Sequence, residues 1–180
     1  MLSLSSLAGW EESVLASIAG ARGTPEERDR QIERSGMYGE YPAIVRAYIE
    51  LFDDDASALE ALKRAIFLVW RSTMALPVET GLAALPEGTS RLVVERLDDA
   101  IRRGSDDAEL RWMLAWYRAE GGFVRELYGG TARVMELGSE LEIDTWRAMT
   151  ITPATMAQRG QMGRYWLALA SSDGPRASGR

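Results

Sequence analysis

Apolar residues recur three and four positions apart along most of the chain, which is the period of an amphipathic α-helix. Stretches of β-branched residues that alternate with polar ones, as in strands, are missing. The first segment, residues 5–21, shows the helical pattern clearly. Its apolar side contains Leu7, Trp10, Val14, Leu15 and Ile18. The pattern therefore predicts an all-α fold.

Residue types at the ends of the periodic segments predict where the helices begin and end. Thr24 suits the N-cap and Pro25 the first helical position, so a second helix is expected there, ending by Gly36. Ser57 and Glu60 have the spacing of a capping box, and Gly104 suits a C-cap. Further helices are expected at residues 42–52, 57–76, 89–103 and 108–119, with a loop over 77–88 that has room for one helical turn.

The last third of the chain is expected to be helical as well. Glycine pairs bracket a short segment at residues 123–128, and helices are expected at 131–141 and 145–149. Thr152 and Pro153 open a last helix that ends near Ala170. We expect a single helical domain over residues 1–170 and a disordered tail over 171–180. The fold class is an irregular helical bundle or a short stack of helical hairpins, with about seven helices.

Two similar junctions raise the question of an internal repeat. Asp54-Asp55-Ala56 and Asp106-Asp107-Ala108 lie 52 residues apart, and each precedes an apolar helix with tryptophan. Repeated helix pairs stack into superhelices. The match outside the aspartates is poor, so the irregular bundle is the preferred alternative.

Composition removes much of the usual catalytic chemistry. The chain has no histidine and no cysteine in 180 residues, so it has no imidazole base, no thiol nucleophile and no ordinary zinc ligand set. Lys63 is the only lysine and asparagine is absent, which the codon bias of a GC-rich bacterial genome explains. The net charge of −6 argues against a nucleic-acid partner. No apolar stretch is long enough to span a bilayer, and a cytoplasmic location is expected.

Tryptophan gives the strongest local signal. Trp112 and Trp116 lie one turn apart on a helix that is apolar nearly all round, and Trp70 lies in the corresponding earlier hairpin. A packed core is the preferred interpretation. The alternative is an aromatic anchor for a partner or an apolar ligand, because binding hot spots favour tryptophan.

Arginines recur seven residues apart on three predicted helices, and each pair lies on one face because seven residues make two turns. These faces are interpreted as solvated surface, with a cationic binding surface as the alternative. The pairs are Arg64 and Arg71, Arg96 and Arg103, and Arg111 and Arg118.

The acidic clusters are candidate ligands for Mg²⁺. Glu50 and Asp54, and Asp106 and Glu109, have the spacing that places two acids on one helix face. Helix starts and stops explain these acids better. Lys63 is expected to form a surface ion pair with Glu60, three residues away, rather than to act as a nucleophile. No phosphate-binding or nucleophile-elbow motif is present, and no cofactor or metal is predicted.

These exclusions leave a non-catalytic protein–protein interaction module as the leading expectation: an adaptor, an immunity or antitoxin-like neutraliser, or an assembly subunit. The partner is expected to be another protein, for which an acidic one is an option. The expected contact residues are Arg64, Arg71, Arg111, Trp112, Trp116 and Arg118. Alternatives are a helical binder of a small apolar or anionic ligand and, less favoured, a carboxylate-dependent metalloenzyme. No known family is matched by a motif.

Overall fold

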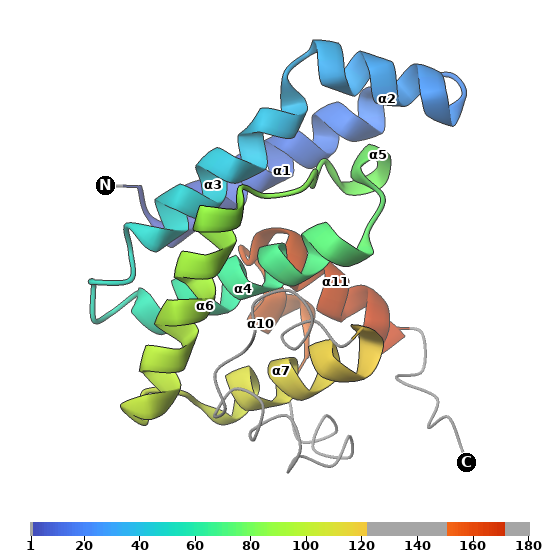
Figure 1. Ribbon diagram of the computed structural model, residues 1–180. Coiled ribbons are helices and arrows are strands. Elements are labelled where there is room, and N and C mark those ends of the chain that lie inside the picture. The colour runs from blue at the N-terminus through green and yellow to red at the C-terminus, as the bar shows by residue number, and fades with distance from the viewer. Residues whose placement is uncertain (1, 122–150, 172–180) are drawn as a thin grey trace.

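The structure, a computed structural model, describes residues 2–121 and 151–171. Within these residues the chain forms nine α-helices and one short 3₁₀ helix and no strand, which confirms the predicted all-α fold (Figure 1). The elements are α1 (Leu4–Gly20), α2 (Pro25–Arg34), η1 (Met37–Gly39), α3 (Glu40–Ile49), α4 (Ala58–Met74), α5 (Pro77–Thr80), α6 (Glu87–Arg102), α7 (Ala108–Gly121), α10 (Pro153–Met156) and α11 (Gly160–Ser171).

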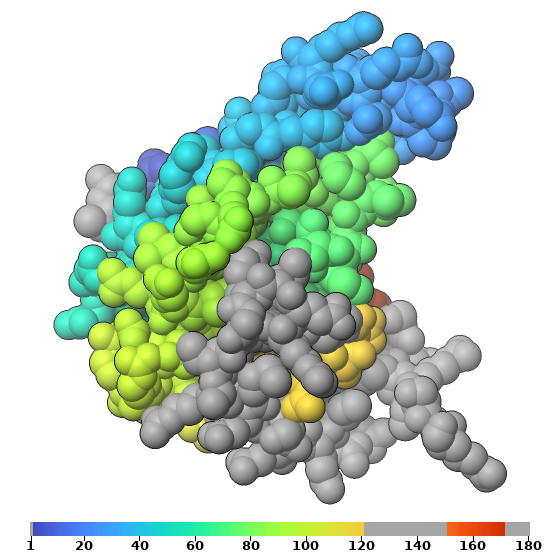
Figure 2. All heavy atoms as spheres, viewed as in Figure 1, coloured from blue at the N-terminus to red at the C-terminus, as the bar shows by residue number. Residues whose placement is uncertain are grey.

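Helix α4 occupies the centre of the bundle. It contacts α3, α6, α7 and α11, and every residue from 61 to 70 is buried. A helix that is apolar nearly all round packs on several sides, which accounts for the central position of α4. At one end of the molecule, α2 and the adjoining part of α3 form a projection (Figure 2). One continuous core cluster includes buried residues from α1 to α11.

Local signals account for most of the helix boundaries. Thr24 caps α2 with a complete capping box, in which the Thr24 hydroxyl accepts from the Glu27 amide and the Glu27 carboxylate accepts from the Thr24 amide. The expected capping box at Ser57 is wrong, because the Ser57 side chain makes no cap hydrogen bond. Glu60 instead binds two arginines, which explains why it does not turn back to the start of α4.

The predicted last helix is interrupted. The segment forms α10 and α11, separated by a turn in which Gln158 and Gly160 both have positive φ. This left-handed turn ends α10 and places Arg159 and Gln161 where they bind residues from distant helices. The predicted segments at 123–128, 131–141 and 145–149 lie outside the described residues, and so do residues 172–180 of the predicted tail.

Helix α11 crosses α10 closely at Gly163. An added Cβ there would lie 2.3 Å from the main-chain oxygen of Met156. Gly163→Ala should therefore destabilise the protein by about 1–3 kcal/mol, since the backbone must move to admit the methyl group. Gly9→Ala is the matched control, because Gly9 lies inside α1 with open space around it. That change should stabilise the protein by about 0.5–1 kcal/mol through helix propensity.

Urea unfolding followed by circular dichroism would measure both changes. Equal effects of the two substitutions would show that the crossing at Gly163 is not tight.

Candidate functional site

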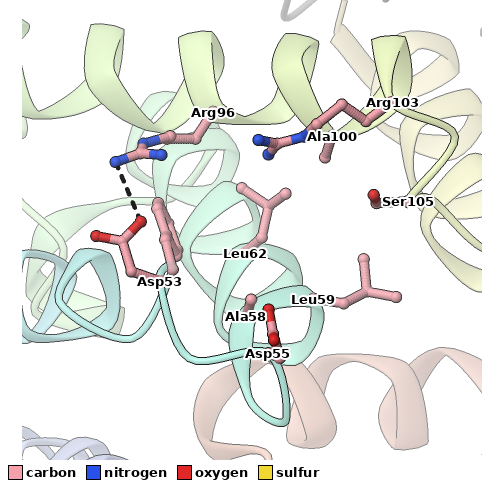
Figure 3. A pocket seen from close by; sticks show the side chains of 10 residues that line it. Asp53, Asp55, Ala58, Leu59, Leu62, Arg96, Ala100, Arg103 and Ser105 are labelled. Carbon is pink, nitrogen blue, oxygen red and sulfur yellow. Dashed lines mark ion pairs between the residues drawn. The ribbon is translucent and has the colours of Figure 1, made fainter.

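A groove of about 640 Å³ opens between α4, α6 and the segment that joins α3 to α4. Its apolar lining comes from both helices and from the joining segment, and four charged side chains and one serine stand around it (Figure 3). The apolar residues are Phe52, Ala58, Leu59, Leu62 and Ala100, and the polar ones are Asp53, Asp55, Arg96, Arg103 and Ser105.

Helical spacing explains why the groove exists. Arg96, Ala100 and Arg103 follow one another at four and three residues, so they share one face of α6. The small Ala100 side chain stands between two long ones and leaves the space that the groove occupies. Both arginine side chains extend from α6 on the groove side (Figure 3).

The C-terminus of α6 is built by a Schellman motif, in which the last helical carbonyls accept from amides beyond the helix. Gly104 has φ +67 and donates its amide to the Ile101 carbonyl at 3.0 Å, and the Ser105 amide donates to the Ala100 carbonyl at 2.9 Å. Gly104 ends the helix as predicted, although the C-cap position itself is Arg103 and Gly104 directly follows it. The motif turns the chain at once, so Ser105 stands at the edge of the groove.

Of the four charged side chains around the groove, two pair with each other and two have no ion-pair partner in the described residues. Arg96 lies 3.5 Å from Asp53, an ion pair that is largely open to solvent. Arg103 and Asp55 are both exposed and make no ion pair with any residue in the described ranges. The groove therefore has a cationic side on α6 and an acidic side on the joining segment, each with one charge available to a partner.

The predicted contact residues Trp112 and Trp116 lie in the core, only 3% and 6% exposed. Their rings stack with centroids 6.1 Å apart, and Trp112 contacts Trp166 edge to face at 4.6 Å. Trp70 stacks on Tyr117 at 4.5 Å. This packing agrees with the preferred interpretation of a core, and it opposes an open ligand cavity between the tryptophan helices.

The predicted contact arginines are not brought together on one face. Arg64 is buried, where it binds Glu60 at 2.7 Å and donates to the Leu4 carbonyl at 3.0 Å. Arg71 is half-buried with its guanidinium over the Tyr165 ring. Arg111 and Arg118 are exposed on α7, and Arg111 pairs with Asp106 at 2.5 Å. Among the predicted contact arginines, Arg118 and part of Arg111 are therefore the ones that a partner could reach.

The expectation for Lys63 is wrong. It is buried, and its Nζ lies 2.6 Å from Asp107 and 2.5 Å from Glu109 rather than beside Glu60. Glu60 and Glu109 both bind Arg159 instead. The result is an ion network of three cations (Lys63, Arg64, Arg159) and three carboxylates that joins α4, α7 and the turn before α11. Burial acts to raise the pKa of Glu109, but hydrogen bonds from Arg159 and Lys63 hold it below its ordinary value.

A second buried polar cluster surrounds Glu11 on α1. Its carboxylate accepts from the Tyr48 hydroxyl at 2.6 Å and from the Gln161 amide at 2.8 Å. Gly160 makes this approach possible, because its φ is +56 and an added Cβ would lie 2.5 Å from the carboxylate. Burial raises the pKa of Glu11 to about 7, against the hydrogen bonds from Tyr48 and Gln161, which act to lower it.

Stability should therefore depend on the charge of Glu11. Its folded-state pKa, about 7, lies above the ordinary value of 4.5, so its contribution is fully present below pH 4.5 and is lost as the pH rises through 7. The expected loss is about 3 kcal/mol between pH 5 and 8. Because the chain contains no histidine, no imidazole titrates in this window.

Urea unfolding at a series of pH values would measure this loss. Glu11→Gln should flatten the profile, whereas Glu95→Gln at an exposed position on α6 should leave it steep. A profile that stays steep in Glu11→Gln would assign the pH dependence to another group.

The ion network yields a separate prediction. Arg159→Gln leaves Glu60 and Glu109 without their shared partner, so it should cost about 3 kcal/mol of unfolding free energy. Arg91→Gln removes one exposed pair with Glu87 and should cost less than about 1 kcal/mol. Chemical unfolding of the two variants would compare them, and similar losses would mean that the network behaves like an ordinary surface pair.

Three residues outside the predicted contact set, Glu11, Arg96 and Arg103, had a visible signal in the sequence. Glu11 lies in line with Leu7, Val14 and Ile18 on the apolar face of α1, where an acid must be buried with a partner. Arg96 and Arg103 are one of the three arginine pairs in the sequence, but they are not among the predicted contact residues. The small Ala100 between them indicates the space of the groove. Arg159 carried no signal, because only the unpredicted turn between α10 and α11 places it.

In the described parts of the chain, no three acidic side chains gather as a metal site would require. None of the helices described there has the length and apolar character to cross a bilayer. No protein family model, curated protein or solved structure matches the chain.

Proposed function

We propose that this protein is a non-catalytic protein–protein interaction module and that its partner binds in the groove between α4 and α6. The observation that carries the proposal is an apolar groove with an exposed arginine, Arg103, at its side, which has no ion-pair partner among the described residues. Interfaces combine an apolar centre with a polar rim, and arginine is enriched in them. An adaptor, a neutraliser of the immunity or antitoxin kind and an assembly subunit would all act through such a contact.

The rest of the molecule supports this choice of surface. Trp112, Trp116 and Lys63 are used in packing and ion pairing, so they offer no contact to a partner. Leu92 on α6 is 38% exposed. It lies four residues before Arg96, on the same face of α6, and extends the apolar surface beyond the groove.

A small anionic ligand is the second candidate. The volume of the groove, about 640 Å³, lies within the range of small-molecule sites, and Arg103 would suit a carboxylate or phosphate. The groove is partly open to solvent rather than an enclosed cavity, which favours a protein segment over a ligand that must be largely enclosed.

The absence of cysteine permits a direct test. Ser105→Cys places a single thiol at the edge of the groove, where a thiol-reactive benzophenone can be attached. Irradiation in extracts of cells that naturally make the protein should give a covalent protein adduct. Ser13→Cys on the exposed surface of α1 is the control and should not give the same adduct.

The captured protein must then bind the purified chain. Ala100→Leu fills the space between Arg96 and Arg103 and should weaken binding at least about 10-fold, since it blocks the groove. Ala19→Leu adds the same atoms on the exposed side of α1 and should leave the affinity unchanged. The proposal fails if Ala100→Leu binds as tightly as the unaltered chain, or if both thiol positions give the same adducts.

A further inference from the structure

The chemistry of the groove also indicates what kind of segment it receives, an inference that rests on the proposed function. Two of its four charged residues, Arg96 and Asp53, pair with each other. Asp55 and Arg103 both lie at helix ends whose dipoles favour them, and neither has an ion-pair partner in the described residues. Arg103 differs from Asp55 in its surroundings, because its guanidinium lies in the groove beside Ala100 and above Leu62 (Figure 3).

The neighbours of Arg103 are apolar. Ala100 lies one turn before it on α6, and Leu62 faces it from α4, while Leu59 lines the groove nearby (Figure 3). An arginine presents a planar fork of donors that fits a carboxylate with two parallel hydrogen bonds. Such a bond is stronger beside apolar side chains than in open solvent, because less water competes with it.

We propose that the groove binds a protein segment that places an apolar side chain against Leu59 and Leu62 and a carboxylate on Arg103. Arg103 then determines specificity by charge, while the half-buried Leu59 supplies most of the apolar area that the partner covers. The alternative role for Arg103 is structural: it occupies the C-cap of α6, where a cation interacts favourably with the helix dipole. The two roles differ in one respect, because only the binding role makes the charge of the preferred segment depend on residue 103.

Selection from a displayed library of random twelve-residue peptides separates the roles. The unaltered protein should enrich peptides that pair an apolar residue with Asp or Glu. Arg103→Glu should enrich peptides with the same apolar residue and Lys or Arg in place of the acid. Arg118→Glu, the same change at an exposed site on α7, should select the same acidic peptides as the unaltered protein.

One enriched acidic peptide would then be measured by fluorescence polarisation. Its dissociation constant should rise about 3- to 10-fold for Arg103→Gln, the neutral variant that keeps the helix end without a repulsive charge. Circular dichroism of each variant would show that it is folded.

The outcomes separate the two proposals. Enrichment of apolar peptides with no preference for charge, or a preference that Arg103→Glu leaves unchanged, would overturn the acidic-segment proposal and leave the groove as a docking site. If Ala100→Leu selects the same peptides as the unaltered protein, binding occurs elsewhere and both proposals fail. A shift caused by Arg118→Glu would place the contact on α7 instead.

Discussion

The buried carboxylate of Glu11 determines how the two ends of the described chain meet. It lies in α1 but accepts the amide of Gln161 in the first turn of α11, an amide that has no partner within its own helix. The positive end of the α11 dipole favours the charged form at that point, while burial opposes it. Tyr48 supplies a second donor, so α1, α3 and α11 share one buried polar contact.

The position of α11 in turn determines the aromatic part of the core. Tyr165 and Trp166 reach α4 and α7, where Tyr165 accepts from the Trp116 indole at 2.8 Å and lies 5.3 Å from the Trp70 ring. Arg159, in the turn just before α11, binds α4 through Glu60 and α7 through Glu109. The polar contacts fix the direction of α11, and the aromatic rings contribute the buried area that stabilises it.

The helices could be predicted from the sequence because their signals are local. Thr24 and Gly104 mark helix ends by the hydrogen bonds that only nearby residues make, and periodic apolar residues mark the buried faces. The ion partners could not be predicted in this way. Lys63 has Glu60 close in sequence, yet it pairs with Asp107 and Glu109, more than 40 residues away, since α7 packs against α4 there. The groove was partly visible in the spacing of Arg96, Ala100 and Arg103, but the facing leucines came only with the packing of α6 on α4.

The same packing explains why the proposed binding surface lies on α6 rather than on the tryptophan helices. Helix α4 is enclosed by its neighbours over residues 61–70, and α7 turns its rings inward, so the large side chains that draw attention in the sequence are used for stability. The groove forms where α4 begins, before it is fully enclosed, and where Ala100 is too small to fill the space beside Leu62. A groove on tightly packed helices suits recognition, because its side chains are already ordered before the partner binds. Less conformational entropy is then lost on binding.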